Sequence, residues 1–246
     1  MRDKTPLLVA ALLTWIGGFV DAVGFLSLGR LYTANMSGNS VSIGIQISGL
    51  SWFEMFRRLW PVITFVIGLL LCRILLEFDA RQRIRSVASI VFVCEIVLLA
   101  PVCIAGAMPG GASPSLQFAF VALLALAMGA QNGALTRFSS LTLHTGFVTG
   151  TLLKFAEQFA KYLMQVFDRL RGREASNKKP LHLSAWLLGI YLAYVSGAAC
   201  GGFSHYAFRL RALMVPIGCF LALIALDLKR PLAVQDEQQQ ATEDNR

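Results

Sequence analysis

Six long apolar stretches dominate this sequence and restrict what it can fold into. Each has about 20 residues, the length of helix that crosses a hydrocarbon core of about 30 Å. They cover residues 7–28, 59–76, 87–105, 116–135, 184–203 and 213–228. Because that core contains no water, a crossing segment must pair its own backbone groups, which favours helices. We therefore expect an all-α fold, a polytopic membrane helix bundle with six full spans.

The composition agrees with a membrane protein and excludes other classes. Only 15% of the residues are charged, whereas a soluble domain carries about 25%. The net charge of +8 does not indicate nucleic-acid binding, because the basic residues cluster in short loops instead of forming a basic face on a folded domain. The five cysteines lie in apolar stretches without C-x-x-C spacing, which favours neither disulfides nor a metal site. We expect a lipid bilayer as partner, no nucleic acid and no cofactor.

The first apolar stretch has one feature of a secretory signal peptide, because Arg2 and Lys4 precede it. Two observations argue against cleavage. Asp21 lies inside the stretch, and no A-x-A-like cleavage site closes it. We therefore interpret this stretch as an uncleaved first span.

Two further segments are too polar for ordinary lipid-facing helices. Residues 33–50 contain several Asn, Ser and Gln side chains. Residues 145–167 place Lys154, Glu157 and Lys161 opposite an apolar face, which is the pattern of one amphipathic helix. If neither segment crosses the membrane, most Lys and Arg residues fall on one side, as the positive-inside rule requires. We therefore expect two broken or amphipathic helices that do not cross, and cytoplasmic positions for both termini.

The chain divides into a short N-terminal segment, two membrane halves and a tail. We expect residues 1–6 to be cytoplasmic, and residues 7–106 and 116–228 to form the two halves. The second half contains a basic cytoplasmic loop, residues 169–183, which is either a linker near anionic headgroups or a docking site for a partner. Residues 231–246 have little to bury and are expected to be disordered.

The two halves share a sequence pattern. Asp21 follows Gly18 at the same spacing at which Asn132 follows Gly129. Downstream, residues 36–41 (MSGNSV) match residues 148–153 (VTGTLL). Each half then contains three spans, an odd number, so the second copy would be inserted upside down. Inverted repeats with interrupted helices near the midplane are typical of secondary transporters.

Polar side chains gather at the matching positions of the two halves. Ser, Thr or Asn beside a glycine can begin a helix whose positive end points into the protein, which suits an anionic or polar ligand. The alternative is that these glycines only allow close helix packing. The expected substrate-binding residues are Asp21, Asn35, Ser37, Asn39, Gln131, Asn132, Thr149 and Thr151.

Two acidic side chains lie well inside apolar spans, Asp21 about two-thirds of the way along the first and Glu95 near the middle of the third. A carboxyl group within the membrane can carry a coupling proton, so both are candidate coupling residues. The alternative for each is a structural role, with Arg73, Gln131 or Asn132 as partner.

The chain resembles the YoaK-like family of uncharacterised bacterial inner-membrane proteins. The resemblance rests on residues 17–22 (GGFVDA) with residues 33–39 (TANMSGN), and on residues 129–132 (GAQN) with residues 149–151 (TGT). Ser37 replaces the threonine that we expect in the family, which keeps the hydroxyl group. The resemblance implies a multi-pass protein of the bacterial inner membrane, and it implies no substrate.

Three functions compete. The first is a small secondary transporter or exporter of a polar or anionic solute through a central site; no Walker A motif indicates direct use of ATP. The second is a structural or sensory membrane subunit whose polar breaks bind nothing. The third is an intramembrane lipid-modifying enzyme, which would need a catalytic constellation that we do not find. We expect a transporter without enzymatic activity, which binds a small-molecule solute as a single chain or as a homodimer.

Overall fold

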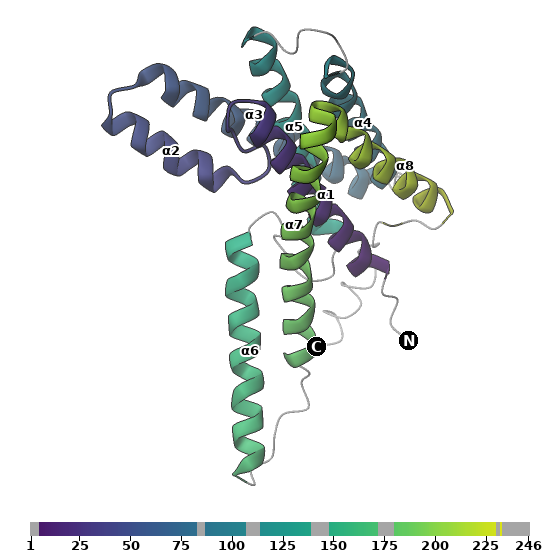
Figure 1. The fold of residues 1–246 in the computed structure, drawn as a ribbon. Coiled ribbons are helices and arrows are strands. Elements are labelled where there is room, and N and C mark those ends of the chain that lie inside the picture. Colours follow the sequence, from purple (N-terminus) through teal and green to yellow (C-terminus); the bar gives the residue numbers. More distant parts are fainter. Residues whose placement is uncertain are drawn as a thin grey trace.

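All regular structure in the described part of this chain is helical, as the sequence predicts. The computed structural model describes residues 5–82, 87–106, 114–138, 148–171, 180–229 and 232. The basic segment 172–179 and nearly all of the tail lie outside these ranges. The helices are α1 (Thr5–Ser27), α2 (Met36–Ser48), α3 (Trp52–Gln82), α4 (Val87–Ala105), α5 (Pro114–Phe138), α6 (Val148–Leu170), α7 (Pro180–Phe208), the 3-10 helix η1 (Arg209–Leu213) and α8 (Met214–Lys229) (Figure 1).

Five helical stretches in the described residues are long and apolar enough to cross a membrane. This is one fewer than the six spans expected, because α7, η1 and α8 form one continuous stretch. Neither α2 nor α6 is among the five. The 13 residues of α2 make a helix of about 20 Å, shorter than the hydrocarbon core. The five stretches are Leu7–Ser27, Trp52–Asp79, Val87–Ala105, Leu116–Leu135 and Pro180–Lys229.

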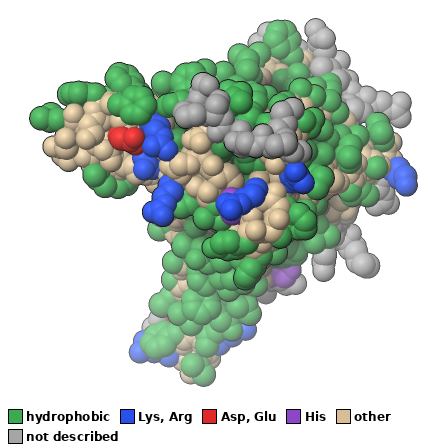
Figure 2. Space-filling view, turned by 45° about the horizontal axis from the view of Figure 1, so that its top comes forward, with side chains coloured by type: hydrophobic (Ala, Val, Ile, Leu, Met, Phe, Trp, Pro, Cys, Tyr) green, Lys and Arg blue, Asp and Glu red, His purple; other side chains and the backbone are tan. Residues whose placement is uncertain are grey.

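Large apolar side chains cover the outer surface of the helices. Phe53, Leu71 and Phe203 are examples of exposed residues of this kind. Figure 2 shows hydrophobic side chains over most of the visible face, with few charged groups between them. So much contiguous apolar surface is rare on a water-soluble monomer. It matches a surface that contacts lipid chains.

Proline and glycine mark several helix boundaries. α5 and α7 begin at Pro114 and Pro180, where the missing N–H of proline is tolerated. After α1 the chain turns at Gly29 and Arg30, whose φ angles are 74° and 59°. Such left-handed angles suit glycine. Arg57 of α3 donates a hydrogen bond to the Gly29 carbonyl at 3.1 Å, which holds this turn against the start of α3.

Helices α1 and α7 cross at very short range because three glycines lie at their contact. A Cβ atom at Gly197 would overlap the carbonyl oxygen of Trp15, and one at Gly201 would overlap that of Phe19. Gly18 of α1 faces the α7 backbone in the same way. Residue numbers rise in the same direction along both helices, so α1 and α7 run parallel.

Helices α3 and α5 form a second crossing of the same kind. A Cβ atom at Gly68 would overlap the carbonyl oxygen of Leu126, and Gly129 of α5 faces the α3 backbone equally closely. Further along, Gly133 faces Cys72. These helices therefore also run parallel, and the two crossings are the most extensive helix contacts in the described residues.

Helices α4 and α8 run antiparallel. Near the start of α4, Ser89 donates from its backbone N–H (3.1 Å) and its hydroxyl (2.5 Å) to Asp227, near the end of α8. Near the end of α4, the Cys103 thiol donates to the carbonyl of Arg211 in η1 at 3.7 Å. Helix α8 and η1 thus extend together along the whole length of α4.

Candidate functional site

The carboxylate of Asp21 holds the segment that joins α1 to α2. Its Oδ1 accepts hydrogen bonds from the backbone N–H groups of Thr33 (2.6 Å) and Ala34 (2.9 Å), and its Oδ2 accepts one from Asn35 (3.2 Å). Tyr194 of α7 donates its hydroxyl to Oδ2 at 2.7 Å. Asp21 is buried. The partners that give it a structural role are thus three backbone amides, the Thr33 hydroxyl (3.4 Å) and a tyrosine, instead of the side chains proposed from the sequence.

Because of these bonds, α2 begins at the depth of Asp21 and not at the end of α1. Asp21 lies about 9 Å before the end of α1, at 1.5 Å per residue. The chain leaves α1 at Ser27, turns back, and starts α2 at Met36, directly after the three amides that bind Asp21. The polar segment therefore folds back inside the protein, beside Asp21.

Asn39 holds the same segment from the α2 side. Its Nδ2 donates to the carbonyl of Tyr32 at 2.7 Å, and its Oδ1 accepts from the N–H of Tyr32 at 3.2 Å. An amide side chain fits this pairing because it carries both a donor and an acceptor. Ser37 is exposed and donates to Asn35 at 2.7 Å. The polar groups of Asp21, Asn35 and Asn39 thus bind other parts of one segment.

A small cavity, whose lining mixes apolar residues with polar side chains, lies beside the Asp21 segment. Its volume is ≈ 20 Å³, which is room for about one water molecule. Gln131 of α5 donates its Nε2 to the carbonyl of Leu13, while its buried Oε1 accepts no hydrogen bond from the described residues. Asn132 donates to the carbonyl of Met128 at 2.8 Å. The lining residues are Leu13, Thr14, Gly17, Ala34, Gln131, Asn132, Leu135 and Tyr194.

The cavity therefore lies where the two sequence halves meet. Gln131 and Asn132 come from the second half, and Ala34, which binds Asp21, comes from the first. Of the predicted substrate-binding residues, Gln131 and Asn132 line the cavity, and Asp21 is one contact away. The Asn39 side chain lies further off in the same segment.

The two predicted threonines lie in the first turn of α6, which begins at Val148. Thr149 is exposed and Thr151 is buried. Neither lines the cavity. Residues 139–147, which precede α6, lie outside the described residues, so only the helix that follows the predicted second polar break is described.

Glu95 lies apart from the Asp21 segment. It is fully buried on α4, and neither of its carboxylate oxygens accepts a hydrogen bond from a described residue. Phe92 and Leu99, one turn before and after it, are buried on the same face of α4. The thiol of Cys72 on α3 lies within electrostatic range of this carboxyl group.

Sequence reasoning missed Tyr194, which connects α7 to Asp21 and lines the cavity. A tyrosine in an apolar span is usually assigned to the membrane interface. Two signals could have identified it. Tyr194 falls near the middle of its helix, where a phenol needs a partner, and it precedes Gly197, where another helix approaches closely.

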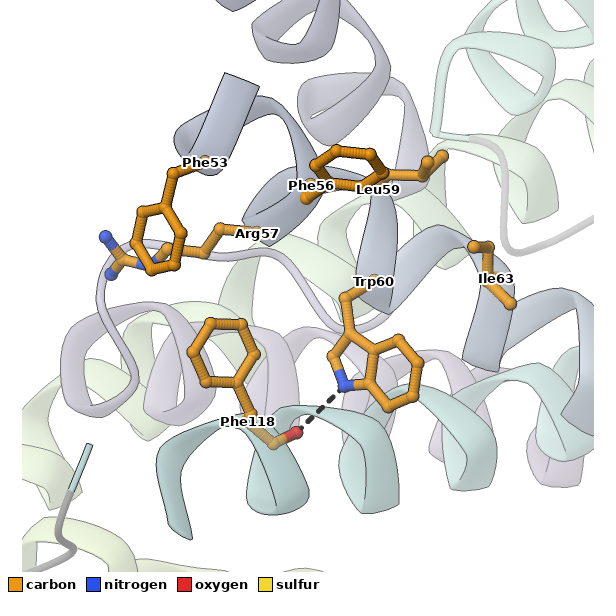
Figure 3. A pocket seen from close by; sticks show the side chains of 7 residues that line it. All are labelled: Phe53, Phe56, Arg57, Leu59, Trp60, Ile63 and Phe118. Atoms are coloured by element: carbon orange, nitrogen blue, oxygen red, sulfur yellow. Dashed lines mark hydrogen bonds between the residues drawn. The ribbon is translucent and has the colours of Figure 1, made fainter. Parts of the chain in front are cut away.

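A larger hollow, of ≈ 340 Å³, lies at the surface where the start of α3 meets α5. The Trp60 indole donates to the carbonyl of Phe118 at 3.0 Å across it (Figure 3). The hollow is apolar and contains none of the predicted polar residues, so it fits lipid chains better than a polar solute. Its lining residues are Phe53, Phe56, Arg57, Leu59, Trp60, Ile63 and Phe118.

The side chains that could bind a metal ion are scattered. Among the described residues there is no cluster of three or more His, Cys, Asp or Glu side chains with suitable positions. The cysteines are free thiols. The chemistry that the described site offers is therefore hydrogen bonding by amides, hydroxyls and one carboxylate.

Comparison with known proteins gives two matches and one negative result. Residues 9–226 match the family described as "protein of unknown function (DUF1275)". Over 157 residues the chain is 27% identical to the UPF0700 transmembrane protein YoaK of Bacillus subtilis (strain 168), and the match covers 61% of this chain and 65% of that protein. No solved structure matches the chain. Together with the apolar helices, these matches identify a multi-pass integral membrane protein.

Proposed function

Because the chain belongs to the DUF1275 family and crosses the membrane several times, we propose that it is a small secondary transporter or exporter of a polar solute. The YoaK-like resemblance is confirmed by the same match. The observation that carries the proposal is the cavity beside the Asp21 segment, lined by Gln131, Asn132 and Tyr194. A cavity of ≈ 20 Å³ is too small for a metabolite, so we assign this conformation to a closed state.

A repeat of the helix crossings supports a transporter built from two related halves. Gly18 of α1 faces the carbonyl of Tyr194 on α7, and Gly129 of α5 faces the carbonyl of Phe65 on α3. Three residues after each of these carbonyls lies another glycine, Gly197 in α7 and Gly68 in α3. Gly197 faces the carbonyl of Trp15, three residues before Gly18, and Gly68 faces the carbonyl of Leu126, three residues before Gly129. The two crossings therefore share one residue pattern, in which α1 of the first half corresponds to α5 of the second, and α7 of the second half corresponds to α3 of the first.

The re-entrant helices repeat as well. Helix α2 begins at Met36 and α6 begins at Val148, which are the residues that the sequence alignment places opposite each other. A common origin explains why two polar helices begin at matching positions. In each helix the second residue is exposed and the fourth is buried: Ser37 and Asn39 in α2, Thr149 and Thr151 in α6.

The directions of the helices support an inverted arrangement with six spans. If α2 and α6 do not cross, then α1 and α7 run outward, α3 and α5 run inward, and α4 and α8 are opposed. The parallel and antiparallel contacts agree with this order. If both α2 and α6 crossed, α4 and α8 would run in the same direction. Because α8 and η1 follow α4 from end to end, we propose α8 as the sixth span, with both termini on the cytoplasmic side of a bacterial inner membrane.

Cysteine labelling tests this topology. Single cysteines at Ser48 and Leu170, both exposed, are placed in a chain without its own cysteines. A membrane-impermeant thiol reagent on whole cells should label position 48 directly and position 170 only after the membrane is opened. Protection of position 48 would mean that α2 crosses, and direct labelling of position 170 would mean that α6 crosses. Either result contradicts the inverted arrangement.

Transport by the purified protein tests the function. Proteoliposomes on a solid-supported membrane are exposed to a panel of small polar and anionic metabolites, and the wild type should give a solute-induced current for one class. Asn132→Ala removes a polar group from the cavity and should weaken the apparent affinity about tenfold, the equivalent of one hydrogen bond of about 1.4 kcal/mol. Gln117→Ala, on the same helix but outside the cavity, should behave as the wild type.

Three outcomes would contradict the proposal. Equal currents from Asn132→Ala and the wild type would place the solute elsewhere. Lipid turnover in detergent, without a gradient, would identify an enzyme. Co-purification of a stoichiometric partner, with no current for any solute, would identify a structural or sensory subunit.

A further inference from the structure

Glu95 is a buried acid that the cavity does not use. Its side chain is fully enclosed, and both carboxylate oxygens lack a hydrogen-bond partner among the described residues. Asp21 is also buried, but it accepts hydrogen bonds from three amides and a tyrosine. Asp21 and Glu95 are therefore in opposite situations, since Asp21 accepts several hydrogen bonds and Glu95 accepts none from the described residues.

Among the described residues, no charged group on the neighbouring helices bonds to Glu95. Helix α4 packs against α5, α8, η1 and, slightly, α3. Helix α5 has no ionisable side chain between Pro114 and Thr136. Asp227 of α8 binds Ser89, and the Arg211 guanidinium group of η1 donates to the carbonyl of Gly106, just after α4. Ser89 and Gly106 are about 9 Å and about 17 Å from Glu95 along the helix axis.

Among the described residues, α3 contributes no bonded charge to Glu95 either. The buried thiol of Cys72 on α3 lies within electrostatic range of Glu95. Arg73, the next residue, is exposed. Within the described residues, Glu95 thus lies in an apolar environment bounded by a thiol.

An ionised carboxylate in such surroundings is very unfavourable, because the free energy needed to remove a charge from water is not offset by hydrogen bonds or an opposite charge. Acids of this kind inside membrane proteins mark proton pathways. We infer that Glu95 holds a proton in this conformation and that the proton is the coupling ion of the proposed transporter, with Asp21 as a structural residue instead of a second proton carrier. This inference rests on the proposed transport function.

The packing provides a connection between Glu95 and the cavity. Asn132 lines the cavity, and Gly133, the next residue of α5, lies against Cys72. The Cys72 thiol in turn lies within electrostatic range of Glu95. The α3–α5 crossing therefore lies between the two sites. If α5 moves against α3 to open the cavity, the surroundings of Glu95 change too, so the proton can leave to water when the cavity changes sides.

Infrared spectroscopy of the reconstituted protein tests the proton directly, without knowledge of the solute. The wild type should show the C=O stretching band of a protonated carboxyl group at neutral pH, and that band should be absent from Glu95→Gln. The glutamine has the same shape and no charge, so the fold should be kept. Glu77→Gln, which removes an exposed carboxyl group on α3, is the matched control and should keep the band. If Glu95→Gln fails to insert, Glu95→Asp should fold and show the band at a shifted frequency.

The proton gradient gives the second readout. Solute currents of the wild type should increase severalfold when an inward or outward pH gradient is applied, and those of Glu95→Gln should not respond. The inference would be overturned if Glu95→Gln kept the carboxyl band. It would also be overturned if the currents of Glu95→Gln responded to the pH gradient as fully as those of the wild type. A Glu95 band without any solute current would leave the proton site in place and reject transport. Solute currents without the band would leave transport in place and reject Glu95 as the carrier.

Discussion

Gly197→Ala should destabilise this protein far more than the same substitution at Gly189 or Gly202. A Cβ atom at Gly197 would overlap the carbonyl oxygen of Trp15, whereas positions 189 and 202 of the same helix have nothing within 4 Å. Alanine is a better helix former than glycine by about 0.5–1 kcal/mol, so the two control substitutions should be neutral or slightly stabilising. At Gly197 the obstacle is backbone, which cannot rotate away. We expect a loss of about 3 kcal/mol, at the upper end of overpacking effects.

Thermal unfolding in detergent, followed by the fraction of protein that stays monodisperse, measures this difference. The proposed repeat adds a second expectation. Gly68→Ala and Gly129→Ala disturb the α3–α5 crossing through the same kind of backbone overlap, so their losses should be as large as that of Gly197→Ala. Unchanged melting of Gly197→Ala would mean that α1 and α7 are further apart than described. Large effects in one crossing and none in the other would reject the equivalence of the two halves.

The helices themselves could be predicted from the sequence because hydrocarbon imposes a simple rule on length and polarity. Their ends were harder to predict. Helix α3 begins at Trp52 and not near residue 59, although Arg57 and Arg58 interrupt the apolar pattern. Their guanidinium groups donate to carbonyls at the end of α1, Arg57 to Gly29 and Arg58 to Arg30. A hydropathy pattern treats such charges as the end of a helix, whereas a tertiary contact can hold them within one.

The candidate site was predictable in part for a related reason. Polar groups inside a membrane protein need partners, so Asp21, Asn35 and Asn39 could be recognised as a set from the sequence. The pattern does not distinguish groups that bind one another from groups that bind a solute. The structure shows that Asp21 and Asn39 bind the segment around Tyr32 and Thr33. The side chains of Gln131 and Asn132 line the cavity instead.

The two acids illustrate the limit of sequence patterns most clearly. Asp21 and Glu95 both interrupt apolar spans and received the same interpretation. They differ in what folds around them. The chain after α1 returns to Asp21 with three amides, and no segment does so for Glu95. Asp21 is a structural acid because the chain turns back at Gly29 and brings the amides of residues 33–35 to its carboxylate. Glu95 has no such segment among the described residues and is therefore the candidate proton carrier.

Asp21→Asn should reduce stability strongly. The carboxylate receives hydrogen bonds from the amides of Thr33, Ala34 and Asn35 and from the hydroxyls of Thr33 and Tyr194, and all five groups act as donors. An amide side chain has one oxygen and one NH₂ group, so one side would place donors against donors. A buried donor without an acceptor costs about 1–3 kcal/mol, and at least two donors face whichever oxygen is replaced. We expect a loss of about 3 kcal/mol or more, measured by the same thermal assay.

Tyr194→Phe isolates one of these bonds and provides the comparison that decides the role of Asp21. It removes a single hydrogen bond to a charged group, which should cost about 2 kcal/mol. Tyr206→Phe, at an exposed position of the same helix, should have no effect. Because Asp21 and Tyr194 share a contact, the double variant should lose less than the sum of the single losses. If Asp21→Asn instead melts like the wild type and loses only solute-induced current, the carboxylate serves the solute directly. The α1–α2 segment would then depend on Asn39 and the arginines of α3 for its position.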